Sequence, residues 1–410
     1  MRQRSTLPRR EPVEWGVRIG LAIGAAWLCY GAVTHSLAYR IRGAAPERAH
    51  ALAPWDGRIT ASWSEKLSGP EASAADRGEA DRLAWLALRQ DPTAVAAAAT
   101  LGINSEIRGD HLAARQRFAY SEKLSRRNLQ TRLWAIEDAV ARGDISNALY
   151  HYDIALRTSR TAPDLLFPVL AGALTDVPIR TALVRKLAER PIWGDLFVSY
   201  VSDNGPNTQA TAAFYTALHQ RGIHPSEAAT AALLTRLLSE NHVDAAWAYY
   251  AAINPGVERS MSRDPGFTAN RMAPSPFDWT PVIDTGTSAT VQRGERGGIF
   301  DFSAPPNLGG PVLRQTQLLP AGEYILAGQS IGIDQPAGSA PYWTLTCSDG
   351  RELGRIPVPN SAQNSGRFSG RFVVSTACPV QQLTLVLRPS DQLSGVSGQI
   401  DNVQLRPAGR

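Results

Sequence analysis

Residues 108–118 read RGDHLAARQRF and residues 142–152 read RGDISNALYHY, so the same tripeptide returns after 34 residues. Four alanines share this period: Ala80, Ala114, Ala148 and Ala182. A glycine–aspartate pair suits a turn between two helices, because glycine adopts positive φ and aspartate caps the helix that follows. A small alanine lets paired helices approach closely, and the aromatic residues Phe118 and Tyr152 can fill the groove between units. These features predict repeated helix–turn–helix units.

The period and its pattern resemble tetratricopeptide repeats, whose turn and second helix match the two quoted segments. The match is clear for units near 80–92, 93–126 and 127–160, and it weakens afterwards. Residues 241–250 again look like the second helix of such a unit. We therefore expect four or five helical hairpins within 79–255. The resemblance implies a solenoid that docks protein partners.

The segment Ile19–Tyr39 carries no formally charged side chain. Its 21 residues would extend roughly 32 Å, enough for a hydrocarbon core of about 30 Å. Arginines crowd the preceding basic tail, residues 1–18, which favours a cytoplasmic N-terminus and export of the rest to the periplasm. A cleaved signal peptide stays open as the alternative, because Ser36–Ala38 resembles a small-residue cleavage site. We expect a single-pass inner-membrane helix over 19–39 and a linker over 40–78.

Past Pro255 the sequence changes to short alternating runs separated by turn signals. The predicted strands are 279–283, 289–293, 298–302, 314–318, 323–328, 342–347, 352–358, 370–375, 382–388 and 399–405. Short strands at this spacing are typical of an antiparallel sandwich. We therefore expect a β-sandwich over residues 256–410.

Two cysteines, Cys347 and Cys378, each end a predicted strand of this sandwich, whereas Cys29 lies in the hydrophobic segment. A bridge between Cys347 and Cys378 would close a loop worth about 3–4 kcal/mol, and it would persist only in an oxidising compartment. Two buried free thiols are the alternative. The sequence favours the bridge.

Residues 265–267 (PGF), 276–279 (PFDW), 319–324 (LPAGEY) and 400–405 (IDNVQL) resemble the opening, turn and closing segments of jelly-roll carbohydrate-binding modules. The resemblance implies a structural calcium near Asp264 and Asp401, although Thr268 stands where such modules often carry glutamate. No other cofactor or metal is expected. The expected fold class is thus multidomain, with a transmembrane helix, an all-α helical-repeat solenoid and an all-β jelly-roll-like sandwich.

Glycan binding by such a module needs exposed aromatic rings, for which the candidates are Trp279, Tyr342 and Trp343. The competing interpretation places each ring in the sandwich core. Tyr342 and Trp343 are consecutive in a strand and point to opposite faces, so at most one of these two is a core residue.

The net charge of +5 is concentrated in the first eighteen residues, which argues against nucleic-acid binding. No histidine follows His242, which excludes a serine–histidine triad within the sandwich. No phosphate-binding glycine loop or zinc motif is present, and we identify no catalytic residues. We expect a protein that is not an enzyme.

The arrangement of anchor, helical hairpins and jelly-roll-like end is similar to that of membrane-anchored accessory proteins from bacterial surface-polysaccharide loci. This resemblance implies a periplasmic scaffold that docks protein partners and contacts glycan during polysaccharide synthesis or export. Two alternatives remain open: a glycan-active hydrolase or lyase with its acids in the sandwich, and an envelope-assembly scaffold that binds protein only.

Overall fold

The computed structural model describes residues 12–284, 286–294 and 297–409. The chain divides into two compact units, residues 1–162 and residues 163–410, which we call the N-terminal and C-terminal units. Most of the predicted basic tail, residues 1–11, lies outside the described residues. Residues 12–18 belong to the first helix.

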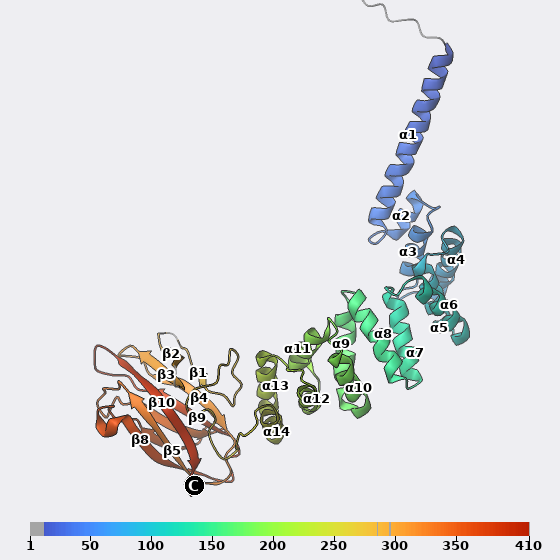
Figure 1. The fold of residues 1–410 in the computed structure, drawn as a ribbon. Coiled ribbons are helices and arrows are strands. Elements are labelled where there is room, and N and C mark those ends of the chain that lie inside the picture. Colours follow the sequence, from blue (N-terminus) through green and yellow to red (C-terminus); the bar gives the residue numbers. More distant parts are fainter. Residues whose placement is uncertain (1–11, 285, 295–296, 410) are drawn as a thin grey trace, which may run out of the picture. The chain divides into compact units, whose positions relative to one another are not determined.

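The N-terminal unit is entirely helical over its described residues (Figure 1). Its helices are α1 Pro12–Ile41, α2 Pro46–Leu52, α3 Gly57–Leu67, α4 Ala74–Gln90, α5 Val95–Ile107, α6 His111–Leu124, α7 Leu129–Ala141 and α8 Ile145–Thr158. Consecutive helices from α3 onward pair as the hairpins α3–α4, α5–α6 and α7–α8.

The two RGD segments form the turns that the sequence predicts. Gly109 and Gly143 have φ values of +79° and +68°, in the left-handed region that favours glycine. Asp110 accepts a hydrogen bond from the backbone N–H of Ala113 (3.1 Å) and so caps α6. Asp144 caps α8 in the same way through Asn147 (3.0 Å). Both turns therefore have the same chemistry and the same place in their hairpins.

The predicted linker over 40–78 is wrong, because most of it is helical. Asp56 caps α3 by accepting from two backbone N–H groups, and a reciprocal Ser73–Asp76 capping box begins α4. Ser64 of α3 donates a hydrogen bond to the carbonyl of Ala80 on α4 (2.8 Å). The first hairpin therefore starts at Gly57. Its first helix, α3, has neither an alanine of the 34-residue period nor an adjoining RGD turn, which are the signals that identify the later units.

α1 is longer than the predicted span at both ends, and it is the one described helix that is long and apolar enough to cross a membrane. It projects from the rest of the N-terminal unit (Figure 1). Within α1 only Thr34 and Ala38 are buried. Ala38 packs in a small core with Ala49, Ala53 and Ile59. The last two turns of α1 are thus part of the folded unit.

The helices of the C-terminal unit are α9 Ala162–Gly172, η1 Ala173–Thr175, α10 Val177–Ala188, α11 Gly194–Asn204, α12 Thr208–Gln220, α13 Glu227–Ser239 and α14 Val243–Ile253. α11 packs on α13, and α12 packs on α10 and α14, so first and second helices form separate layers. Among described residues six successive helix pairs run from α3 to α14; five of them, α5 to α14, lie within 79–255, where four or five are expected, and the α3–α4 pair begins before this range.

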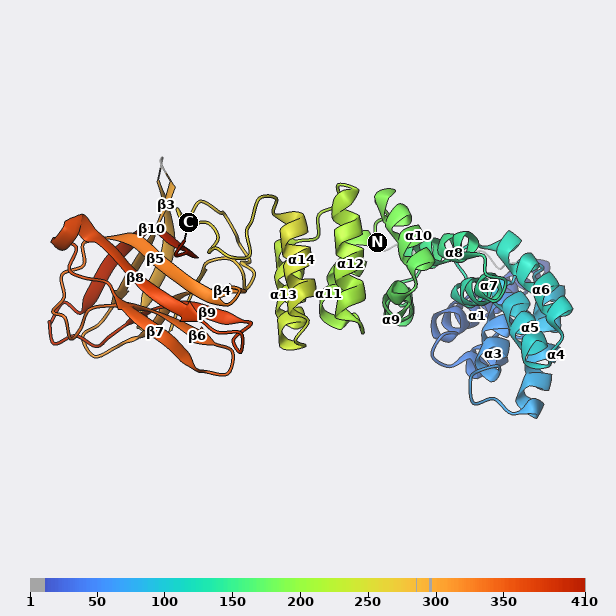
Figure 2. The same ribbon diagram turned by 90° about the horizontal axis from the view of Figure 1, so that it is seen from below.

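Ten strands follow: β1 Thr280–Pro281, β2 Ser288–Gly294, β3 Gly297–Ala304, β4 Gly310–Gln317, β5 Gly322–Ile331, β6 Tyr342–Cys347, β7 Glu352–Pro357, β8 Arg367–Val374, β9 Gln381–Leu387 and β10 Val396–Pro407. Each predicted strand overlaps one of them. Sheet A has the order β1-β4-β9-β6-β7, and sheet B has the order β2-β3-β10-β5-β8. All recorded pairings are antiparallel. The two sheets lie face to face in Figure 2, which confirms a helical and β-sandwich multidomain fold.

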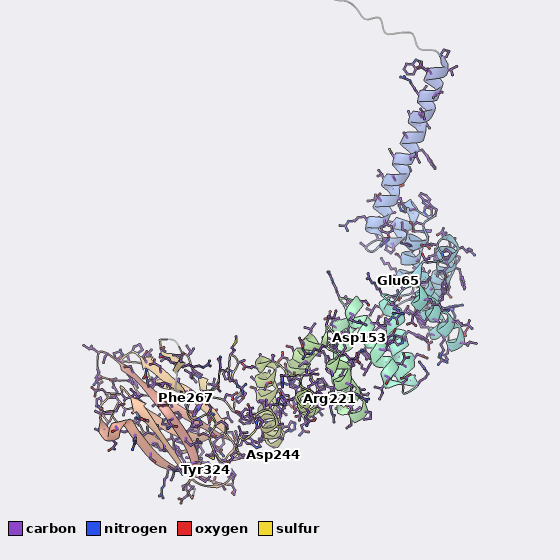
Figure 3. The ribbon with its side chains drawn as sticks, in the orientation of Figure 1. Glu65, Asp153, Arg221, Asp244, Phe267 and Tyr324 are labelled. Atoms are coloured by element: carbon purple, nitrogen blue, oxygen red, sulfur yellow. A yellow bond between two sulfur atoms is a disulfide. The ribbon has the colours of Figure 1, made fainter. Side chains whose placement is uncertain are left out.

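The sandwich core lies between the two sheets, and alternate residues of the strands β2 to β10 enter it. Trp343 and Leu345 on β6 and Leu383 and Leu385 on β9 are fully buried there. Phe267, labelled with Tyr324 in Figure 3, reaches the same core from the segment before β1. This alternation decides which side chains remain on the outer faces.

A buried arginine joins α14 to the sandwich within the C-terminal unit. The guanidinium of Arg263 donates to the carbonyl of Phe277 (3.0 and 3.1 Å) and to the side-chain oxygen of Gln317 (2.8 Å). It also lies 6.0 Å from the ring centroid of Trp247 on α14. Burial lowers the pKa of Arg263 to about 10, so the group stays charged at neutral pH. Its many neutral acceptors compensate the cost of burying that charge.

Candidate functional site

Two of the three aromatic candidates lie in the core, which corrects their assignment to glycan binding. Trp343 is 0% exposed and Trp279 is 7% exposed, and their ring centroids are 5.8 Å apart. The indole N–H of Trp279 donates to the carbonyl of Asp264 (2.9 Å). Neither ring presents a face to solvent. The alternation of β6 that buries Trp343 places Tyr342 on the outer face of sheet A.

Tyr342 is half-buried and has arginines from the strands on both sides. The guanidinium carbon of Arg355, on β7, lies 4.9 Å from the ring centroid, and that of Arg388, just after β9, lies 4.7 Å away. Both separations suit cation–π contacts. The Tyr342 ring therefore positions two guanidinium groups, and a ligand at this surface would contact these groups.

Strand register extends this surface across sheet A. One row runs Arg314–Thr384–Thr344–Arg355 over β4, β9, β6 and β7. The next row runs Pro311–Val386–Tyr342–Pro357 over the same strands. Four strands at about 4.8 Å spacing make each row roughly 14 Å wide, similar to a short oligosaccharide. We call these two rows, together with Arg388, the outer face of sheet A.

The outer face of sheet A is cationic. Its three arginines are Arg314, Arg355 and Arg388, and the neighbouring acid, Glu352, is bound to Arg355 (2.5 and 2.8 Å). The side-chain hydrogen bonds of this ion pair are the main cause that raises the pKa of Arg355 and lowers the pKa of Glu352. Guanidinium groups bind carboxylates in bidentate geometry. The face can therefore bind an anion, with the hydroxyl of Thr384 as an added polar contact, whereas Thr344 is buried and donates to the carbonyl of Gly354 (3.1 Å).

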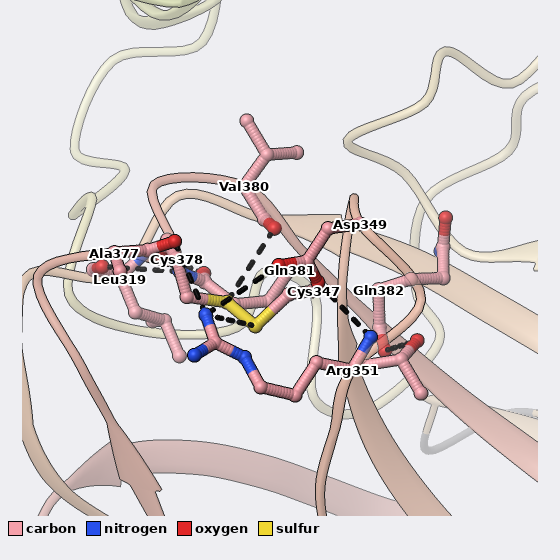
Figure 4. The surroundings of a disulfide bond; sticks show 10 residues. Leu319, Cys347, Asp349, Arg351, Ala377, Cys378, Val380, Gln381 and Gln382 are labelled. Atoms are coloured by element: carbon pink, nitrogen blue, oxygen red, sulfur yellow. Dashed lines mark hydrogen bonds and ion pairs between the residues drawn. A yellow bond between two sulfur atoms is a disulfide. The ribbon is translucent and has the colours of Figure 1, made fainter.

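The disulfide between Cys347 and Cys378 is present, as the sequence predicts (Figure 4). Its Cα atoms are 5.5 Å apart, and it links the end of β6 to the segment between β8 and β9. Arg351 donates to the carbonyl of Ala377 (3.2 Å) beside the bridge. The bridge fixes the end of the strand that carries Tyr342.

The proposed calcium site does not fit the residues that the structure describes. One carboxylate oxygen of Asp264 accepts from the backbone and hydroxyl of Thr268 (both 2.7 Å), and the other accepts from the backbone of Ala269 (3.0 Å). Among described residues no group of three or more acidic, histidine or cysteine side chains gathers there or elsewhere, and Asp401 adds no such cluster. Calcium needs six to eight oxygen ligands. Asp264 instead stabilises its own loop.

The repeat residues singled out by sequence are mostly packing residues. Ala80, Ala114 and Ala148 are buried on α4, α6 and α8, and so are Phe118 and Tyr152. Ala182 on α10 is only half-buried, because the adjacent Leu183 and Val184 take the packed positions there. The close-contact role of the alanine therefore ends after the third hairpin.

A cavity of about 250 Å³ lies between α6, α7 and α8, and Trp134, Asp138, Arg142 and His151 are among its lining residues. Below it Arg132, fully buried, donates to Glu122 (2.7 Å) and to Nδ1 of His151 (2.9 Å). Burial is the main cause that lowers the pKa of His151, which keeps its ring neutral. Sequence reasoning missed this cavity, since the residues come from three helices with no shared motif.

A second cavity, of about 290 Å³, lies beside α13 and α14 in the C-terminal unit. Its acids are already bound within the protein. Glu227 accepts from the backbone of Met272 (2.7 Å), and Asp278 accepts from the hydroxyl of Tyr250 (3.0 Å). Burial raises the pKa of Tyr250, so its hydroxyl remains a donor. These bonds hold the 271–278 loop onto the last hairpin.

No family model matches the sequence, and no curated protein matches it. Among solved structures, the chain is similar to a family 61 carbohydrate-binding module in complex with β-1,4-galactotriose, with 16% identity, TM-score 0.24, and coverage of 35% of this chain and 96% of that one. It is also similar to the C-terminal family 6 module of a laminarinase from Zobellia galactanivorans (16% identity, TM-score 0.19, coverage 29% and 90%). A third is the enzymatically active domain of tailspike protein 4 of bacteriophage CBA120 (12% identity, TM-score 0.23), and the match spans 31% of this chain and 18% of that domain.

Proposed function

We propose that this protein is a membrane-tethered adaptor of the bacterial cell envelope that binds an acidic polysaccharide without cleaving it. The observation that carries the proposal is the pair of arginines held over Tyr342 on the outer face of sheet A. Carboxylate groups of a uronic-acid polymer would pair with the guanidinium of Arg388 and compete with Glu352 for that of Arg355, and the hydroxyl of Thr384 would bind a sugar hydroxyl. The role belongs to surface-polysaccharide synthesis or export.

In the proposed arrangement α1 is an uncleaved inner-membrane anchor, and the bulk of the chain lies in the periplasm. Cleavage after Ala38 would remove α1 from the core that Ala38 shares with Ala49, Ala53 and Ile59. It would also remove His35, whose Nδ1 lies 3.7 Å from Asp56. A signal peptide makes no such contacts with the mature fold, so this packing favours retention of α1. An oxidising compartment also suits the Cys347–Cys378 bridge.

The helical hairpins provide the surface for a protein partner of the synthesis or export machinery. Stacked hairpins form extended surfaces that suit a protein segment. The cavity beside Trp134 combines an aromatic ring with Asp138 and Arg142, which is a suitable mixture for such a segment. In-cell cross-linking from this cavity would identify the partner.

Glycan binding is tested with the full chain in detergent, immobilised on a sensor and exposed to polygalacturonate or to neutral β-1,4-galactan. We expect polygalacturonate to bind, with an affinity that falls as salt rises. Arg355→Ala with Arg388→Ala should weaken binding at least tenfold, about 1.4 kcal/mol. Arg371→Ala on β8 is the matched control, since this exposed arginine lies on sheet B and should leave binding unchanged.

Equal binding by the double variant and the unchanged protein would refute the assignment to this face. Binding of neither polymer would favour a scaffold that contacts protein only. Release of reducing sugar from polygalacturonate would instead establish a glycan-active enzyme. Each outcome is read from the same protein sample, so the three functions are separated in one experiment.

A further inference from the structure

The outer end of α1 is fixed to the first hairpin by contacts on one helical face. Thr34 and Ala38 are one turn apart and buried, and Ala38 packs against α2 and α3. His35 lies beside Asp56, which is itself held as the cap of α3 by hydrogen bonds from Arg58 and Ile59 (2.8 and 3.0 Å). The turn from Ala53 to Gly57 therefore lies at the same level along α1 as His35.

The level of this turn can be compared with the thickness of a bilayer. Residues 12–30 of α1 are all exposed, and the first buried residue is Thr34. Glu14 and Arg18 are charged, so the hydrocarbon core of about 30 Å is spanned by the uncharged stretch Ile19–Tyr39, roughly 32 Å long, and its outer boundary falls close to Tyr39, four residues beyond His35. Thr34 and Ala38 face the N-terminal unit and not lipid. His35 and the Ala53–Gly57 turn therefore lie within about one helical turn, roughly 5 Å, of the hydrocarbon boundary.

The turn carries Trp55, whose side chain is 61% exposed. It is held in place, since Gln90 on α4 donates to the carbonyl of Pro54 (2.8 Å) and the backbone of Asp56 donates to Ala53 (3.2 Å). An exposed tryptophan on a fixed turn is costly in water and favourable at a membrane interface, where its apolar ring and N–H are both accommodated.

Exposed arginines are present around the same level. Arg40 lies in the last turn of α1, Arg48 lies on α2, and Arg58 lies in the first turn of α3, where it pairs with Asp91 (2.9 Å). Basic residues near a membrane surface are attracted by anionic headgroups, by about 1 kcal/mol each. Glu47 on α2 and Asp56 in the turn are acids, and Asp91 neutralises Arg58, so Arg40, Arg42 and Arg48 leave this end of the unit with a small positive charge.

We propose that the Ala53–Gly57 turn is a second membrane contact. Trp55 inserts into the headgroup region of the periplasmic leaflet, and the neighbouring arginines Arg40 and Arg48 bind anionic phospholipid. This inference rests on the proposed transmembrane role of α1. The contact would prevent the N-terminal unit from rotating freely about its anchor. A single helix gives tethering only, whereas a helix and a fixed turn also give orientation.

The test reconstitutes the full chain in vesicles of phosphatidylcholine and phosphatidylglycerol and uses one environment-sensitive fluorescent label at a time. The native free cysteine, Cys29 on α1, reports the span. A Cys29→Ser background with Trp55→Cys reports the turn. The same background with Trp85→Cys is the matched control, because Trp85 is a comparably exposed tryptophan (49%) on α4. Quenching by lipids with a nitroxide near the headgroup, and in separate samples with a nitroxide in the acyl chain, is measured for each.

We expect the label at position 55 to be quenched several-fold more than the label at position 85, and more strongly when phosphatidylglycerol is present. Equal, weak quenching at 55 and 85 with strong acyl-chain quenching at 29 would overturn the inference and leave the anchor intact. Trp55 would then be free for a protein partner. Absence of quenching at 29 would contradict the transmembrane role itself, so the two failures are distinct.

Discussion

Gly102 on α5 lies against the ring of Phe118 on α6, and this ring stacks on Trp134 of α7 with centroids 4.4 Å apart. A Cβ added at Gly102 would lie 2.9 Å from two ring carbons of Phe118. The ring cannot move away easily, because Trp134 covers its other side. We predict that Gly102→Ala destabilises the N-terminal unit by roughly 1–3 kcal/mol, as expected for overpacking. Chemical denaturation of the full chain in detergent, followed by tryptophan fluorescence, measures this change.

Gly78 on α4 provides the control for this prediction. It is exposed, and a Cβ there would meet no atom within 4 Å. Gly78→Ala should therefore stabilise α4 by about 0.5–1 kcal/mol, because alanine loses less backbone entropy in a helix. If both substitutions had the same sign, the ladder from Gly102 to Trp134 would not be a packing constraint.

Sequence alternation was sufficient to separate Tyr342 from Trp343, but it could not show which of the two faces the core. The structure assigns Trp343 to the core and Tyr342 to the surface. The arginines over Tyr342 were not predictable, since Arg355 and Arg388 are 33 positions apart and meet only through the register of β7, β6 and β9. Contacts across strands depend on register, which the local pattern does not specify.

At the scale of elements, the bridge between β6 and the segment before β9 gives a second prediction. Non-reducing peptide mass analysis should find Cys347 linked to Cys378, with Cys29 free. Reduction should lower the free energy of unfolding of the C-terminal unit by about 3–4 kcal/mol, from the loop that the bridge closes. The N-terminal unit contains no part of this loop, so its transition should not change.

The readout for this prediction is calorimetry with and without reductant. Alkylation of both Cys347 and Cys378 in denatured, unreduced protein from the periplasm would contradict the bridge. A downward shift of both thermal transitions by the same amount would contradict the assignment of its effect to the sandwich alone.

The elements themselves were predicted unevenly. All ten strands could be located, because alternation and turn residues are local signals. The RGD turns were equally clear, since glycine and aspartate each have a fixed role there. α3 was missed because its buried positions, such as Ile59 and Ser64, only become meaningful when α4 packs on them. Propensity alone does not report such tertiary stabilisation.

At the scale of the whole molecule, the prediction concerns topology. A reporter that is active only in the cytoplasm should be silent when fused after Arg410 and active when fused before Met1. The reason is the arginine-rich N-terminus, which favours retention of that end in the cytoplasm. Intact mass of the purified protein should include residues 1–38. Cytoplasmic activity at the C-terminus would contradict the orientation, and loss of those residues would establish a cleaved signal peptide.

The buried guanidinium of Arg263 also limits how this chain can be divided or recombined. Its neighbours include Trp247 on α14 as well as the sandwich residues Phe277 and Gln317. A cut at residue 255 would leave the Arg263 guanidinium with these acceptors, but it would remove Trp247 and Tyr250, whose rings pack on Phe277 with centroids 6.0 and 5.0 Å away. Gene rearrangement should therefore transfer the sandwich together with the last helical hairpin. The segment that is transferred as one piece begins before α13, although the change in composition falls at Pro255.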